Sequence, residues 1–160
     1  MTAKKLITRE GYQALKAELD QLWRIERPEV TKKVSWAAAL GDRSENADYQ
    51  YNKKRLREID RRVRYLSKCI ENSQIVDYSP QQEGKVYFGA WVTIENAAGE
   101  SKRLRIVGVD EIYDKQDHVS VAAPMARALL GKQIDDEVIV KTPRGDAEWW
   151  VVGIEYVKKD

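Results

Sequence analysis

A regular spacing of seam positions between residues 49 and 70 limits the possible fold more than any other feature of this chain. The positions are Tyr49, Asn52, Leu56, Ile59, Val63, Leu66 and Ile70, at alternating steps of three and four. This is the heptad spacing of a coiled-coil seam. Because a single helix cannot bury such a stripe by itself, the pattern requires a partner helix.

The preceding segment predicts that partner helix. Its apolar positions are Leu15, Leu19, Leu22, Val30, Val34 and Ala37. The spacing slips by about one residue near Pro28, and a proline inside a helix removes a hydrogen bond and kinks it, so we expect a bend there and not an end. Two helices of about 30 residues would form an antiparallel hairpin about 45 Å long.

The turn between the two helices has recognisable end signals. Gly41 suits the left-handed conformation that follows a helix. Asp42 is the predicted N-cap of the second helix, and Glu45, three residues on, would complete a capping box.

The second half of the chain changes from helical spacing to short segments rich in β-branched and aromatic residues. These are residues 86–95, 103–109, 118–122, 137–141 and 148–157, and a helix is predicted over 124–130 between Pro124 and Gly131. The sequence therefore predicts an α+β fold: a helical hairpin over 1–77, a linker over 78–84, and a small antiparallel sheet with one helix over 85–160.

The basic residues are concentrated on the second predicted helix. The chain of 160 residues has a net charge of only +2, so its overall charge does not indicate a nucleic-acid ligand. Residues 53–68, however, hold eight basic residues against Glu58 and Asp60, a local charge of +6. A basic helix face is the footprint of a phosphate-binding surface. The alternative, a charged face that only keeps a coiled coil soluble, stays open. The predicted nucleic-acid-binding residues are Lys53, Lys54, Arg57, Arg61, Arg62, Arg64 and Lys68.

Acidic residues gather at the predicted tip, at Asp42, Glu45 and Asp48. Acids suit the start of a helix, so a purely structural role is one interpretation. The other is a shared Mg²⁺ site, because Mg²⁺ prefers oxygen ligands. Two carboxylates are too few to bind the ion stably, but with a partner's carboxylates they could complete a two-metal phosphodiester centre.

Other site chemistries have little support. Cys69 is the only cysteine and His118 the only histidine, so we expect no internal disulfide and no zinc site. A single cysteine is typical of a cytoplasmic protein. No apolar run is long enough for a membrane span, and we expect no membrane partner.

Two segments resemble a known family. Residues 41–49, Gly-Asp-Arg-Ser-Glu-Asn-Ala-Asp-Tyr, are similar to the tip motif of the bacterial Gre transcript-cleavage factors. Residues 124–132, Pro-Met-Ala-Arg-Ala-Leu-Leu-Gly-Lys, resemble a second family segment, and the likeness covers nearly the whole chain. The long basic run over 51–62 resembles the GreB branch in particular.

The resemblance implies a function that depends on a partner. The hairpin would enter the secondary channel of RNA polymerase, where Asp42 and Glu45 help hold the second Mg²⁺ and the basic residues contact the nascent RNA 3′ end. The C-terminal domain, of the FKBP-like type, would dock on the coiled coil at the channel rim through Pro124, Met125 and Arg127. The polymerase would cleave its own backtracked RNA, so this chain would be no enzyme by itself, and it is expected to be a monomer.

Two alternatives accompany this interpretation. A regulator could bind the same channel without stimulating cleavage. The second half could also be a peptidyl-prolyl isomerase, since Tyr87, Phe88, Trp91, Trp149 and Trp150 could line a pocket, although aromatic residues more simply fill the core of a small sheet. One departure from the family pattern concerns docking: Ala122 and Ala123 precede Pro124, where a serine or aspartate could cap the helix.

Overall fold

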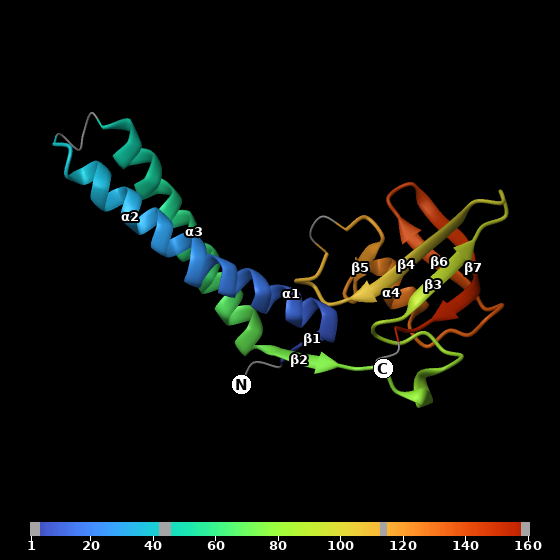
Figure 1. Cartoon of the computed structure of the whole chain (residues 1–160). Coiled ribbons are helices and arrows are strands. Elements are labelled where there is room, and N and C mark those ends of the chain that lie inside the picture. The colour runs from blue at the N-terminus through green and yellow to red at the C-terminus, as the bar shows by residue number, and fades with distance from the viewer. Residues whose placement is uncertain (1–3, 42–45, 113–114, 158–160) are drawn as a thin grey trace. The chain divides into compact units, whose positions relative to one another are not determined.

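The computed structural model describes residues 4–41, 46–112 and 115–157 (Figure 1). The chain divides into two compact units, Tyr12–Asn72 and the combination of Met1–Gly11 with Ser73–Asp160. These units place the short strands β1 (Lys5–Thr8) and β2 (Ser73–Val76) with the sheet, whereas the predicted boundary at residue 77 placed them with the hairpin.

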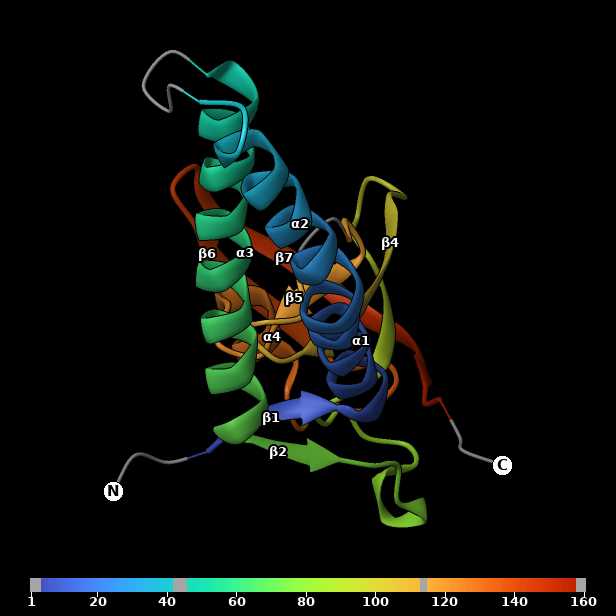
Figure 2. The ribbon, with the colours of Figure 1, turned by 60° about the vertical axis from the view of Figure 1, so that its left-hand side comes forward.

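The first unit is a helical hairpin. Helices α1 (Arg9–Asp20), η1 (Gln21–Glu26) and α2 (Arg27–Ala38) follow one another without interruption, and α3 (Ala47–Glu71) runs back along them (Figures 1 and 2). On α1, η1 and α2 the buried seam residues are Leu15, Leu22, Val30 and Ala37. On α3 the buried seam residues are Tyr49, Ile59 and Leu66, and the other seam positions are half-buried. The predicted heptad seam is therefore confirmed.

The slip in spacing between Leu22 and Val30 has a different cause from the one predicted. Segment η1 is a π-helix, in which the Arg27 N–H donates to the carbonyl of Leu22, five residues back. A π-helical turn contains more residues than an α-helical turn, so it moves the apolar stripe by the observed amount. Pro28 lies in the first turn of α2. The predicted kink at this proline is replaced by a π-helical turn before it.

The second unit contains a five-stranded sheet in the order β5-β4-β3-β7-β6. Its strands are β3 (Trp91–Glu95), β4 (Ser101–Val107), β5 (His118–Ser120), β6 (Glu137–Thr142) and β7 (Gly145–Glu155). Neighbouring strands are antiparallel except β4 and β5, which are parallel. The predicted α+β class with a small antiparallel sheet is confirmed, and the short strand β5 joins the sheet in parallel with β4. A short 3₁₀ helix, η2 (Pro80–Gln82), lies in the predicted linker.

The core of the second unit lies between the sheet and helix α4 (Pro124–Leu129). Ala126 and Leu129 of α4 are fully buried there. They belong to one apolar cluster with residues of every long strand of the sheet, among them Val92, Ile94, Ile106, Val138 and Val151. Gly131 has a φ of +84°, a value that favours glycine, and it ends this helix as predicted.

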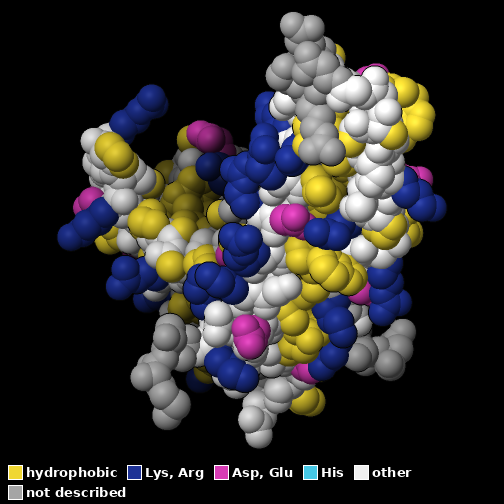
Figure 3. All heavy atoms as spheres, turned by 90° about the vertical axis from the view of Figure 1, so that its left-hand side faces the viewer, with side chains coloured by type: hydrophobic (Ala, Val, Ile, Leu, Met, Phe, Trp, Pro, Cys, Tyr) yellow, Lys and Arg dark blue, Asp and Glu magenta, His cyan; other side chains and the backbone are white. Residues whose placement is uncertain are grey.

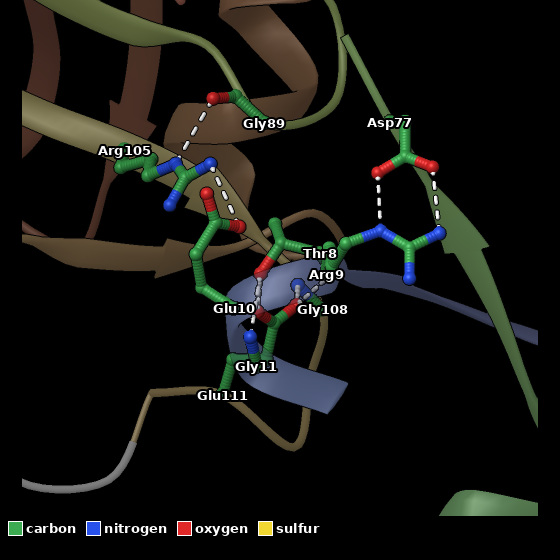
Figure 4. A network of polar contacts seen from close by, with 9 residues as sticks. All are labelled: Thr8, Arg9, Glu10, Gly11, Asp77, Gly89, Arg105, Gly108 and Glu111. Atoms are coloured by element: carbon green, nitrogen blue, oxygen red, sulfur yellow. Dashed lines mark hydrogen bonds and ion pairs between the residues drawn. The ribbon is translucent and has the colours of Figure 1, made fainter. Parts of the chain in front are cut away.

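A polar network attaches strand β1 to the loop after β4 (Figure 4). The Glu111 carboxylate accepts hydrogen bonds from the Thr8 N–H at 3.0 Å, from the Thr8 hydroxyl, and from the Gly108 N–H at 2.6 Å. The Thr8 Oγ1 in turn accepts from the Gly11 N–H at 3.0 Å. A Cβ on Gly11 would collide with this carboxylate, so a larger residue there would displace Glu111 from the network.

Two arginines complete this network. Arg9 donates to both oxygens of Asp77, each at 2.9 Å, and so joins the start of α1 to the end of β2. Arg105 is buried; it donates to the Gly89 carbonyl at 3.0 Å and lies 3.5 Å from the Glu10 carboxylate.

Among the described helices, none is long and apolar enough to cross a membrane.

Candidate nucleic-acid interface

The outer face of α3 carries a row of exposed basic side chains. Arg57, Arg61, Arg64 and Lys68 follow at steps of four, three and four, which places them on one side of the helix, away from the seam. All four are exposed, and none makes an ion pair with a residue that the structure describes. We call these four residues the basic face. With the tip end of the hairpin facing the viewer, Lys and Arg side chains form a row down one side of the hairpin (Figure 3).

Arg62, by contrast, is bound within the hairpin. Its Nε and Nη2 donate to the two oxygens of Glu18 at 2.6 and 2.9 Å. Its guanidinium also lies 5.1 Å from the centre of the Tyr65 ring. We predicted Arg62 as a nucleic-acid contact, but in the structure two of its N–H donors join α3 to α1.

Two further ion pairs join the helices of the hairpin. Arg55 lies 3.1 Å from Glu26 and 3.5 Å from Glu58, and Arg27 lies 2.8 Å from Asp60. The hydrogen bond from Arg62 lowers the pKa of the Glu18 carboxyl, with a smaller contribution from its positive charge. Three arginines of the hairpin therefore stabilise the helix pairing.

The remaining predicted contacts differ in how freely they can reach a ligand. Lys54 is exposed and makes no ion pair with a described residue. The Lys53 ammonium donates to the Tyr49 hydroxyl at 2.8 Å and lies 5.2 Å from the centre of that ring. Lys53 is thus positioned over Tyr49, with its charge still at the surface.

The start of α3 is capped by Asn46 and not by Asp42, which corrects the predicted cap. The Asn46 Oδ1 accepts from the Tyr49 N–H at 3.0 Å, and its Nδ2 donates to the Ala37 carbonyl of the other helix at 2.7 Å. Both helices are therefore joined at the tip by one side chain. Gly41, after the end of α2, has the expected positive φ, +116°.

The predicted acidic pair, Asp42 and Glu45, lies outside the described residues. The described N-cap of α3 is Asn46. Asp48 is described; it is exposed in the first turn of the helix, where an acid is favourable. Within the described ranges, no group of three or more Asp, Glu, His or Cys could hold a metal ion.

The predicted docking residues lie on α4, with Pro124 and Met125 at its start and Arg127 in its last turn. Pro124 and Arg127 are exposed, and Met125 packs partly against the core. The N-cap is Ala123, whose side chain makes no capping hydrogen bond. The helix therefore begins with its proline alone, as its sequence predicts.

The aromatic residues considered for an isomerase pocket have no common environment. Trp149 belongs to the core cluster and Phe88 is buried, while Tyr87 is 38% exposed. Trp91 and Trp150 are half-buried. Trp91 is covered by the Arg103 guanidinium, 4.2 Å from its ring centre. These side chains pack with their own neighbours, which is the simpler of the two interpretations.

Comparison with known proteins covers both units. Residues 5–75 match the family model "Transcription elongation factor, N-terminal", and residues 81–156 match "Transcription elongation factor, GreA/GreB, C-term". The chain belongs to the GreA/GreB family of transcription elongation factors. The predicted resemblance to this family is confirmed.

Curated relatives support the GreB branch of the GreA/GreB family. A protein of Pseudomonas putida named transcription elongation factor GreB is 66% identical over 94% of this chain and 93% of its own length. One of Vibrio cholerae with the same name is 66% identical over 96% of both chains. A solved structure, GreA factor homolog 1 of Thermus thermophilus, is 26% identical, covers 95% of this chain and 99% of its own, and gives a TM-score of 0.44.

Proposed function

We propose that this elongation factor stimulates RNA polymerase to cleave its own backtracked RNA. The hairpin would enter the polymerase secondary channel with its tip first. The basic face would then lie along the extruded RNA 3′ segment, and the acidic tip would reach the active centre.

One observation carries this proposal. The exposed row Arg57, Arg61, Arg64 and Lys68 runs along the outer side of α3, and this helix is capped by Asn46. The basic charge is thus available to phosphates, and the acids Asp42 and Glu45 precede the capping residue in the sequence. The family name, transcription elongation factor, supports a function on RNA polymerase.

The acidic pair fits a shared Mg²⁺ and not a resident one. Two carboxylates provide the hard oxygen ligands that Mg²⁺ prefers, but they leave most of its coordination to water, phosphate or another protein. A bound Mg²⁺ would lower the pKa of a bound water and stabilise charge on the phosphate. Asp42 and Glu45 would contribute ligands and orient the water, while the polymerase supplies the remaining carboxylates.

The docking of the second unit is part of the same proposal. Pro124 and Arg127 are exposed on the short helix α4, and Met125 packs this helix against the core. We propose that this helix contacts the coiled coil at the channel rim. Such a contact outside the channel would hold the factor while the tip acts inside.

The direct test uses stalled, backtracked polymerase with a 5′-labelled transcript. We expect the transcript to shorten rapidly when factor, polymerase and Mg²⁺ are all present, and slowly when the factor or Mg²⁺ is omitted. A factor that inhibits initiation but leaves the transcript length unchanged would instead be the non-cleaving regulator of the same channel.

A further inference from the structure

Three large apolar side chains are exposed near the tip of the hairpin. Trp36 is 60% exposed, Leu40 61% and Tyr51 71%. None is needed for the seam, which is filled by Val30, Ala37 and their partners. Exposed apolar groups of this size are a common mark of an interaction surface when they lie together.

Helical spacing and one ion pair place the three side chains on the same flank of the hairpin. The contact between Arg55 and Glu26 marks where this flank of α3 meets the first helix. Tyr51 lies four residues before Arg55 on α3. From Glu26, steps of three, four and three lead along α2 to Trp36, and Leu40 lies four residues further on, in the turn that follows the helix. We call Trp36, Leu40 and Tyr51 the apolar flank.

The apolar flank and the basic face differ in the ligand that they fit. The basic face carries four positive side chains without a described ion pair. The intervening residues along the flank, Glu29 and Lys33, have opposite charges, and Arg55 is paired with Glu26 and Glu58. A polyanion gains little from such a surface, and Leu40 has no ring on which a base can stack. Tryptophan and tyrosine beside leucine fit an apolar protein surface.

The size of the flank argues against a second copy of this chain as its partner. An aromatic side chain offers at most about 250 Å², so three side chains exposed by about two thirds offer at most about 500 Å². A symmetric dimer would then bury about 1,000 Å² in total, below the roughly 1,200 Å² of a stable interface. A patch of this size is typical of an anchor within a larger interface.

We propose that the apolar flank docks on an apolar part of the protein wall of the polymerase channel, leaving the basic face toward the RNA. This inference rests on the proposed function, because it assumes that the hairpin enters the channel. The hairpin is then two-sided: one flank recognises protein and the outer side of α3 recognises nucleic acid. Trp36 and Tyr51 would be the anchors of the protein contact.

The test measures binding of the full-length factor to RNA polymerase that holds no RNA. We expect Trp36→Ala and Tyr51→Ala each to weaken this binding by about tenfold, as loss of an interface anchor does. Trp23→Ala is the matched control, because Trp23 is 54% exposed but stacks on Arg27, which pairs with Asp60 and not with Glu26. It should bind as wild type does. At saturating factor, all three variants should shorten the transcript at the wild-type rate.

Each other outcome would overturn the inference. Unchanged binding without RNA, with a weaker response only on backtracked complexes, would assign the flank to RNA bases. A wild-type dimer in sedimentation equilibrium that Trp36→Ala dissociates would assign it to self-association. If Trp23→Ala weakened binding to polymerase as much as Trp36→Ala does, the apolar flank would not be distinct from the rest of the hairpin. If wild type binds and shortens the transcript, these results count against the flank alone; if wild type does neither, the proposed function falls as well.

Discussion

Asn46 is the residue on which the geometry of the tip depends most. Its side chain caps α3 through the Tyr49 N–H and also binds the Ala37 carbonyl at the end of α2. An N-cap contributes about 1 kcal/mol, and a second hydrogen bond adds a similar amount. This one amide therefore sets both the start of α3 and its position beside α2.

Replacement of Asn46 should consequently destabilise the hairpin. We expect Asn46→Ala to lower the free energy of unfolding by about 1–2 kcal/mol, as measured by urea denaturation followed by circular dichroism. Asp48→Ala, which removes an exposed acid from the same turn, should cost no more than about 0.5 kcal/mol. Equal costs for the two variants would contradict the capping role of Asn46.

The ion pair between Glu18 and Arg62 should have a pH-dependent contribution to stability. The folded pKa of Glu18 lies below its ordinary value of 4.5, so the pair contributes fully above that pH and is lost as the pH falls through the lower folded value. Both side chains are more than a third exposed, which limits the coupling to about 0.5 kcal/mol.

A double-mutant cycle with Glu18→Gln and Arg62→Gln measures this coupling. We expect about 0.5 kcal/mol at pH 6.5 and no measurable coupling once the carboxyl is protonated in the folded state. A coupling that persists with the carboxyl protonated would show that the hydrogen bonds and not the charge stabilise the pair.

The sequence predicts the role of the seam residues better than that of the arginines. Ile59 and Leu66 follow from spacing alone, because burial is periodic along a helix. In the sequence, Arg62 stands among basic residues that make no described ion pair. Only the position of Glu18 on the other helix shows that Arg62 is paired. Contacts between helices depend on their register, which one sequence does not display.

At the scale of the element, the seam of α3 should show graded sensitivity to truncation. Ile59 is 1% exposed, whereas Leu56 is half-buried. We expect Ile59→Ala to cost about 2–4 kcal/mol and Leu56→Ala distinctly less, in thermal or urea unfolding. A larger loss at Leu56 would place the seam on a different face of the helix.

The basic face of α3 should set part of the salt dependence of the factor. Arg57→Gln with Arg61→Gln removes two charges, each worth about 0.7 in the slope of log affinity against log salt on a single strand. We therefore expect the slope, measured on backtracked complexes with long extruded RNA, to fall by about 1.4.

The control removes the same charge elsewhere on the hairpin. Lys16→Gln with Lys32→Gln takes two exposed cations from the first helix. This variant should keep the wild-type salt slope on long extruded RNA. An equal fall in both variants would mean that the whole charge of the hairpin matters and not the basic face in particular. An unchanged slope with Arg57→Gln and Arg61→Gln would mean that the basic face only keeps the hairpin soluble.

Among the elements, prediction from the sequence failed where a segment was too short to show a pattern or where its pattern had no regular period. The parallel pair of β1 and β2 has four residues in each strand, from segments more than sixty residues apart. The pairing of β4 with β5 depends on the path of the loop between them. The π-helical turn at Gln21–Glu26 was visible only as a slip in spacing, for which Pro28 offered a more familiar cause.

At the scale of the whole molecule, the three proposed functions belong to different surfaces. The outer side of α3 would bind RNA, the apolar flank would bind protein, and the acids before α3 would act in the polymerase active centre. The α+β class and the family followed from the order of motifs along the chain. The proposed assignment of RNA and protein contacts to different sides of the hairpin did not follow from the motifs, because it depends on which charges the other helix neutralises.

The measurement that tests the central claim most directly compares three variants on backtracked polymerase with labelled RNA and Mg²⁺. We expect Asp42→Ala and Glu45→Ala to bind polymerase as wild type does but to shorten the transcript at least about a hundredfold more slowly, as loss of a group acting on the transition state does. Asp48→Ala, an exposed acid of the same tip, should keep nearly the wild-type rate. Full cleavage by both Asp42→Ala and Glu45→Ala would contradict the assignment of the acidic pair.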